Sequence, residues 1–197
     1  MTASPAQTLA WAEGAWSHAP VAGRDDGDDL VVTAAEGSDA WRRTAYGFVH
    51  DSAHALLAPF AAGTAVEVEF TADFDAQFDQ AGVFVRVDDE RWAKAGVEFA
   101  DGVLGAGAVV TDGFSDWSVG AVPEWQGARL LVRVSRGGDA MTVRAGVAGG
   151  PLRLLRVAPF PDALVATAGP FLAAPTRAGL AVRFYAWRVT AADASLH

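Results

Sequence analysis

Alternating apolar and polar residues mark two adjacent strands in the middle of the chain. In residues 91–100 (RWAKAGVEFA) the odd positions from 93 onward are apolar, and the even positions carry Trp92, Lys94, Gly96 and Glu98. Because successive side chains of a strand point to opposite faces, this alternation predicts a strand with one dry face. Residues 80–87 (QAGVFVRV) alternate in the same way, and the acidic run at 88–90 (DDE) predicts a hairpin loop between the two strands.

The length of this loop decides which residues face each other. A two-residue loop would place Val85 opposite Lys94 and mix valines with the charged face. A three-residue loop keeps one face apolar, because a slip of one residue reverses every side chain. The pattern therefore predicts four cross-strand pairs: Arg86 with Trp92, Phe84 with Lys94, Gly82 with Gly96, and Gln80 with Glu98.

The facing glycines, Gly82 and Gly96, leave bare backbone in the middle of this hairpin. Glycine inside a strand marks either a bend in the sheet or a close approach of a ligand to the backbone. Both interpretations are open at this point.

Short alternating segments continue through the rest of the chain. Residues 65–74 alternate apolar with polar side chains, and further strands are predicted at 30–35, 41–49, 103–112, 117–122, 128–135, 141–147, 152–157, 164–172 and 179–190. Many short strands separated by Gly- and Pro-containing turns predict an all-β sandwich. With no internal repeat or linker, residues 1–197 are predicted to form one domain. The residues expected in its core are Val83, Val85, Val87, Ala95, Val97, Phe99, Leu130, Val132, Val134, Val182 and Phe184.

Composition narrows the classes of partner. Of the 197 residues, 51% are hydrophobic and 20% charged, which is typical of a globular protein. The net charge of −9 opposes binding to nucleic acid and to an anionic membrane surface. The absence of cysteine excludes disulfide and thiolate chemistry. The sequence shows neither a signal-peptide pattern nor an apolar run of about 18 residues, so we expect a cytoplasmic location.

A set of motifs follows in order along the chain: SDAW at 38–41, YGF at 46–48, FDQAG at 78–82, WAKAGVE at 92–98, VVT at 109–111 and SDWS at 115–118. With these motifs, nearly the whole chain resembles the domain-of-unknown-function family that includes the regulation-of-enolase proteins. The resemblance implies a concanavalin A-like antiparallel β-sandwich (jelly roll) with a concave face that binds carbohydrate in related folds, although a fold alone gives no activity. The family's recurrent positions fall on Trp41, Gln80, Gly82, Trp92, Lys94, Gly96, Glu98, Asp116 and Trp117.

Carbohydrate binding is the function that these residues favour. Sugars present C–H faces that pack on aromatic rings and hydroxyls that need polar partners. The candidate ligand-binding residues supply both: Trp41, Tyr46, Gln80, Trp92, Lys94, Glu98, Asp116 and Trp117. The predicted ligand is a saccharide held on the concave face. Burial of the tryptophans in the core is the alternative for the aromatic members, and a protein partner docked on the same face, as in a regulatory module of metabolism, is the alternative function.

The charged members of this face need separate partners. Lys94 and Glu98, on one strand, lie roughly 13 Å apart, which is too far for a salt bridge. We expect Gln80 to bond to Glu98, and Asp116 to pair with Lys94 if the SDWS segment turns over the face. With Trp92 walling one end, these residues would frame a cleft for one or two sugar rings, lined by Lys94 and Glu98.

Catalysis and metal binding have weaker support. Hydrolases with this sandwich carry E-x-D-x-x-E on one strand face, and that motif is absent. A second carboxyl for Glu98, such as Asp116, would have to come from another strand, so a divergent glycoside hydrolase is the second alternative. His50 and His54 have zinc spacing only on a helix, and on a strand they lie roughly 13 Å apart. The sequence predicts no metal and no cofactor.

Overall fold

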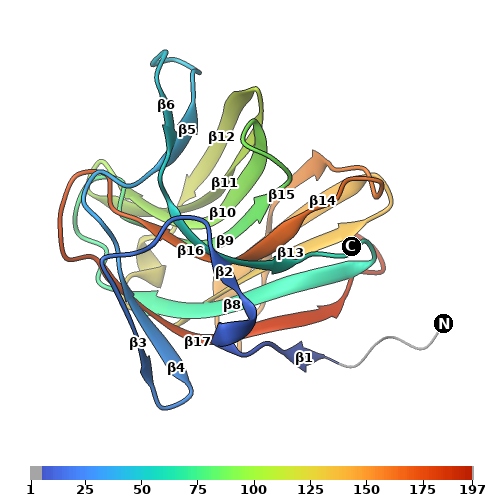
Figure 1. Cartoon of the computed structure of the whole chain (residues 1–197), viewed down its shortest axis with the longest axis horizontal. Helices are drawn as coiled ribbons and strands as arrows, with labels where there is room; N and C mark the ends of the chain where they lie inside the picture. Colours follow the sequence, from blue (N-terminus) through green and yellow to red (C-terminus); the bar gives the residue numbers. More distant parts are fainter. Residues whose placement is uncertain (1–5, 197) are drawn as a thin grey trace.

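A computed structural model describes residues 6–196, which form a sandwich of two antiparallel sheets (Figure 1). The first sheet has the order β15 (Arg153–Pro159), β14 (Ala140–Val147), β13 (Leu130–Gly137), β8 (Thr64–Ala72), β17 (Ala181–Ala191), β4 (Asp29–Thr33), β3 (Ala22–Asp26), with β1 (Gln7–Thr8) paired to β17. The second has the order β12 (Phe114–Ala121), β11 (Val103–Asp112), β10 (Arg91–Ala100), β9 (Gln80–Arg86), β16 (Thr167–Ala173), β7 (His54–Pro59), β2 (Ala15–Trp16). The predicted all-β sandwich is confirmed.

Helical structure within residues 6–196 is limited to two short 3₁₀ turns. These are η1 (Trp11–Glu13) and η2 (Pro123–Trp125). No helix in this part of the chain is long and apolar enough to cross a membrane.

The main core lies between the two sheets, where the apolar sets of the alternating strands meet. Of the side chains expected there, nine are buried: Val83, Val85, Ala95, Val97, Leu130, Val132, Val134, Val182 and Phe184. Val87 and Phe99 are only partly buried and pack against the edge of the core, because they lie at the ends of the central hairpin.

The central hairpin has the predicted register. β9 pairs with β10 so that Arg86 faces Trp92, Phe84 faces Lys94, Gly82 faces Gly96 and Gln80 faces Glu98. In the loop the Asp88 carboxylate accepts the backbone N–H groups of Glu90 (2.9 Å) and Arg91 (2.7 Å). This side-chain turn stabilises the short acidic connection.

The facing glycines are required by the close approach of the two strands. A Cβ on Gly82 would lie 2.1 Å from the carbonyl oxygen of Ala95, and one on Gly96 would lie 2.1 Å from that of Ala81. Gly107, the neighbour of Gly96 on β11, is restricted in the same way by Ser118 O at 1.9 Å. The obstacle in each case is the backbone of the adjacent strand, so a side chain at any of these positions would collide with it. The three glycines also form a row without side chains across the outer face of the second sheet.

A second apolar cluster lies on the outer face of this sheet, away from the main core. It consists of Ala40, Ala53, Ala55, Phe84, Trp92, Val109, Phe171 and Ala173. The segment that covers it includes a separate hairpin, β5 (Ala40–Arg42) and β6 (Val49–Asp51), which stands up from the sandwich in Figure 1.

This hairpin is fixed to the sheet from both of its strands. Arg86 binds Asp51 through two parallel hydrogen bonds of 3.0 and 2.8 Å. The backbone N–H of Arg42 donates to the Ser115 hydroxyl at 2.9 Å. The hairpin is therefore a fixed wall beside the exposed part of the sheet.

Candidate functional site

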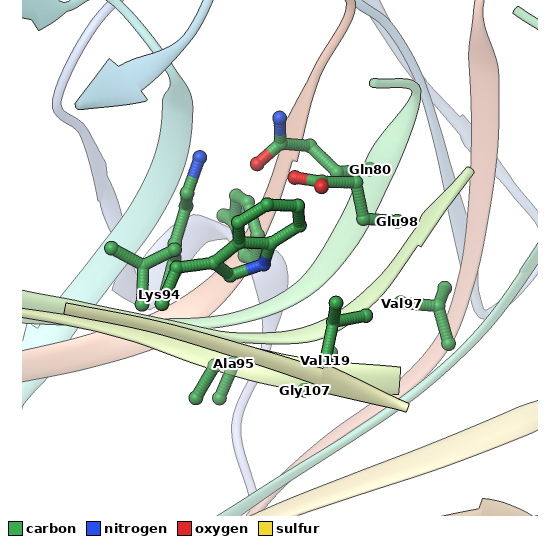
Figure 2. A pocket seen from close by; sticks show the side chains of 12 residues that line it. Gln80, Lys94, Ala95, Val97, Glu98, Gly107 and Val119 are labelled. Carbon is green, nitrogen blue, oxygen red and sulfur yellow. The ribbon is translucent and has the colours of Figure 1, made fainter. Parts of the chain in front are cut away.

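A cavity of about 460 Å³ lies between the β5–β6 hairpin and the outer face of the second sheet. Its polar lining residues are Asp39, His50, Gln80, Lys94, Glu98 and Thr176, and its aromatic ones are Trp41, Tyr46, Phe48, Phe78 and Trp117. Figure 2 shows Gln80, Lys94 and Glu98 rising from one side of the sheet, with Ala95 directed to the other. Because these three residues alternate with core residues on β9 and β10, the same periodicity that builds the core brings them together.

Two glycines of the row, Gly96 and Gly107, line a smaller pocket that shares Gln80, Lys94, Glu98 and Trp117 with this cavity. This smaller pocket, whose lining side chains Figure 2 shows, has a volume of about 20 Å³. That volume is enough for one water molecule.

Lys94 is a buried cation whose partner is Asp39. The Lys94 side chain is 5% exposed and that of Asp39 20%, and the Lys94 Nζ lies 2.8 Å from Asp39 Oδ1. The same oxygen accepts the backbone N–H of Ala40 at 2.7 Å and the side-chain amide of Gln80 at 3.2 Å. Asp39 is fixed in turn by its backbone carbonyl, which accepts the N–H groups of Ser52 and Ala53.

Gln80 therefore has partners other than the expected one. Its amide nitrogen donates to Asp39 and, at 3.1 Å, to the carbonyl oxygen of Phe78. Phe78 has a φ of 66°, an unusual left-handed conformation for a bulky residue. This turn at the start of β9 presents the Phe78 side chain to the cavity.

The Glu98 side chain has no hydrogen-bond or ion-pair partner within residues 6–196, although it is only partly exposed and lines both the cavity and the smaller pocket. Burial raises the pKa of the Glu98 carboxyl to about 7, against the attraction of Lys94 and with a further increase from Asp39. The expected Gln80–Glu98 hydrogen bond is absent from the bonds that Gln80 makes. Glu98 is thus a carboxyl group whose polar atoms are free to meet a ligand.

The aromatic side of the cavity is a chain of ring contacts that runs along the hairpin. Trp41 meets Trp117 edge to face with ring centroids 6.5 Å apart, and meets Tyr46 at 5.8 Å. Tyr46 stacks on Phe48 at 5.3 Å. Tyr46 and Trp117 are well exposed, at 62% and 41%, so their rings present apolar surface to the opening.

Two expected site residues lie elsewhere. Trp92 is 2% exposed and stacks on Phe84 with ring centroids 5.5 Å apart, so it belongs to the apolar cluster under the hairpin and lines no wall of the cavity. Asp116 is exposed and pairs with Arg156 at 2.6 Å. The reason is that SDWS lies within strand β12, where Asp116 and Trp117 must point to opposite faces.

The remaining six expected residues line the cavity: Trp41, Tyr46, Gln80, Lys94, Glu98 and Trp117. Sequence reasoning missed Asp39, Phe48, His50 and Phe78 as lining residues. The signal was available for three of them, because SDAW contains Asp39, YGF contains Phe48 and FDQAG begins with Phe78. Only the neighbours of these residues in each motif were selected.

The two spaced histidines have separate roles. His50 lines the cavity, whereas His54 is buried, and its ring nitrogens contact the His18 carbonyl (3.1 Å) and the Ala35 N–H (3.0 Å). Burial lowers the pKa of His54. Among residues 6–196 no group of three or more His, Asp or Glu side chains could hold a metal ion.

Comparison with known proteins connects this geometry to a family. A family model described as "Protein of unknown function (DUF1349)" matches residues 16–192. A relative named Regulation of enolase protein 1, from Saccharomyces cerevisiae, is 33% identical over 179 residues, which cover 91% of this chain and 90% of the relative.

Solved structures extend the comparison to the fold. The crystal structure of a functionally unknown protein from Saccharomyces cerevisiae matches with a TM-score of 0.87 and 31% identity, covering 93% of this chain and 98% of that one. A xylan β-1,4-xylosidase from Bacillus halodurans C-125 matches with a TM-score of 0.65 and 12% identity, covering 84% of this chain but 33% of the xylosidase chain. At that identity the likeness shows the sandwich fold alone.

Proposed function

The chain belongs to the DUF1349 family of proteins of unknown function, and we propose that it binds a saccharide in the cavity beside the β5–β6 hairpin. The observation that carries the proposal is the combination of an aromatic wall and a polar side in a cavity of about 460 Å³. Small-molecule sites are commonly about 300–1,000 Å³, mostly apolar, with a few fixed polar groups.

The aromatic wall suits the apolar faces of sugar rings. Trp41, Tyr46 and Trp117 form contacting rings on a hairpin and a strand that are both fixed to the sheet. Their rings lose few rotational states on binding, since each has only two side-chain torsions. A pyranose stacked on them would place its hydroxyls toward the polar side of the cavity.

The polar side of the cavity offers carboxyl groups as hydrogen-bond partners for sugar hydroxyls. The carboxylate of Asp39 is fixed by Lys94 and Gln80 through one oxygen, and its second oxygen has no hydrogen bond within the described residues. The Glu98 carboxyl has no partner within residues 6–196, and the small pocket beside Gly96 lies next to it. Because the side chains of Asp39, Lys94 and Gln80 are already held by one another before a ligand arrives, little ordering of these three is required on binding.

Titration calorimetry with a panel of oligosaccharides tests the proposal. We expect at least one of them to bind with a Kd of about 1 mM or lower, and Trp117→Ala to weaken that binding at least tenfold, about 1.4 kcal/mol. Phe114→Ala is the matched control, because Phe114 is an exposed aromatic residue of the same strand that does not line the cavity. Equal effects of the two substitutions would contradict the proposal, and no binding by any saccharide would favour a protein partner on this face.

Glycoside hydrolysis is a second candidate, supported by a specific observation. Asp39 supplies from another segment the second carboxyl that Asp116 does not, and both Asp39 and Glu98 line the cavity. A glycosidase needs one carboxyl as general acid and one as base or nucleophile. Release of reducing ends from a bound oligosaccharide, lost in Glu98→Gln, would support hydrolysis; bound ligand recovered intact after long incubation would exclude it for that ligand.

A further inference from the structure

We propose that the saccharide bound in this cavity is positively charged: an amino sugar whose free ammonium group pairs with Glu98. The inference rests on the proposed function and names the ligand class of the same site. It follows from the charges that line the cavity and from which of them already have partners.

The one lysine of the cavity is already neutralised. Lys94 lies 2.8 Å from Asp39, which also receives Gln80 and the N–H of Ala40. Along one strand Lys94 and Glu98 are roughly 13 Å apart at their Cα atoms, so Lys94 does not form an ion pair with Glu98. The cavity therefore contains a paired cation and an unpaired carboxyl group.

An unpaired carboxyl in such a place selects against anions and for cations. A ligand carboxylate or phosphate would meet Glu98 and Asp39, and the one lysine among the described lining residues is already paired, in a protein of net charge −9. A neutral hydroxyl can donate one hydrogen bond to Glu98, whereas an ammonium adds charge to that bond and makes it considerably stronger.

The aromatic wall favours a sugar over a simple cation. Trp41, Tyr46 and Trp117 line the cavity together with Glu98, and their rings can stack on the apolar face of a sugar ring. A bare ammonium ion would leave these rings without contact. An amino sugar satisfies both features, since its ring stacks on the wall while its ammonium group reaches Glu98.

The titration of Glu98 supplies an independent signature. Burial raises its pKa to about 7, and an ammonium bound beside it would lower that pKa, so binding below pH 7 releases a proton. The other titratable or charged groups that line the cavity are Lys94 on the same strand, Asp39 from the preceding segment, and His50 and Tyr46 from the hairpin. His50 is the imidazole among them, so the variant His50→Gln serves as the control for its contribution.

Three trisaccharides with the same β-1,4-linked backbone form a matched set of probes. They are the glucosamine trimer, the N-acetylglucosamine trimer and the glucose trimer. By calorimetry at pH 6.5 we expect the glucosamine trimer to bind at least tenfold more tightly than either neutral trimer, with an affinity that decreases with added salt.

The variant Glu98→Gln keeps the shape of the side chain and removes its charge. It should abolish the preference for the glucosamine trimer over the glucose trimer, with thermal unfolding as the check on folding. In the native protein the affinity for the glucosamine trimer should increase from pH 5.5 to 6.5, by at most tenfold for one linked proton. His50→Gln should retain this increase and Glu98→Gln should lose it.

Two results overturn the inference while leaving saccharide binding in place. One is a glucose trimer that binds as tightly as the glucosamine trimer, and the other is a preference for the amino sugar that survives Glu98→Gln. If none of the three trimers nor any other saccharide binds, the proposed function itself fails, and the inference fails with it.

Discussion

Removing Asp39 should destabilise the protein far more than removing an ordinary surface carboxylate. The substitution Asp39→Ala leaves the ammonium of Lys94, whose side chain is 5% exposed, without its carboxylate. It also removes the acceptor of Gln80 and of the Ala40 N–H. Breaking a buried ion pair from one side commonly costs about 3–5 kcal/mol, because an uncompensated charge stays behind.

The size of this effect can be tested by urea unfolding with a matched control. With a slope of about 2 kcal/mol per molar urea, a loss of about 4 kcal/mol lowers the unfolding midpoint by about 2 M. Glu124→Ala breaks an exposed pair with Arg153, in which the Glu124 and Arg153 side chains are 53% and 57% exposed, and should leave the unfolding midpoint almost unchanged.

A double variant separates the buried charge from the lost packing. Lys94→Met keeps an apolar stem and removes the ammonium, so Asp39→Ala combined with Lys94→Met should be less destabilised than Asp39→Ala alone. A cost for Asp39→Ala below about 1 kcal/mol, equal to that of the control, would refute the view that this pair is effectively buried. A double variant whose loss is the simple sum of the two single losses would do the same.

Three further predictions concern stability. Because the pKa of Glu98 is raised from its usual 4.5 to about 7, the native state holds a proton that the unfolded state releases; the associated stability is present below about pH 4.5 and is lost as the pH rises to about 7. Between pH 4.5 and pH 8, the free energy of unfolding of Glu98→Gln should increase relative to that of the native protein by up to about 3 kcal/mol. Parallel pH profiles of the two proteins would contradict the assigned pKa. Gly96→Ala should lower the free energy of unfolding by about 3 kcal/mol or more, because the new Cβ would lie 2.1 Å from a backbone oxygen. The control Gly120→Ala, whose Cβ would have nothing within 4 Å, should lower it by less than about 1 kcal/mol in the same denaturation series. Arg136 is buried and donates hydrogen bonds to the carbonyl oxygens of Phe60, Asp162 and Leu164. Arg136→Ala should therefore lower the free energy of unfolding, measured by thermal unfolding, by about 3 kcal/mol or more. A loss under about 1 kcal/mol would show that water replaces the hydrogen bonds of the guanidinium group.

The central hairpin and its register could be predicted from the sequence because they depend on local alternation. Only a three-residue loop separates valines from charged residues, and the structure pairs Gln80 with Glu98 and Phe84 with Lys94 as that loop requires. The apolar sets of the strands likewise indicated most of the core, since period-two alternation follows from strand geometry alone.

Alternation along a strand does not predict what covers the face that points away from the main core. Trp92 and Lys94 share the outer face of β10, yet Trp92 is packed under Ala40 and Ala53 while Lys94 borders a cavity. That difference is set by where the β5–β6 hairpin lies over the sheet, and this position depends on distant contacts such as Arg86 with Asp51. Sequence neighbours carry no information about it.

The partner of Lys94 was also decided only in three dimensions. Asp116 was the candidate because SDWS was interpreted as a turn, but residues 114–121 are a strand and its parity sends Asp116 to the opposite face. Asp39, 55 residues away in the chain, supplies the carboxylate. The sequence by itself determined the strands of the central hairpin, their register and which side chains share a face, because these follow from local periodicity. The tertiary structure alone decided which of those side chains are covered, which are paired and which, like Glu98, are left without a partner in a cavity.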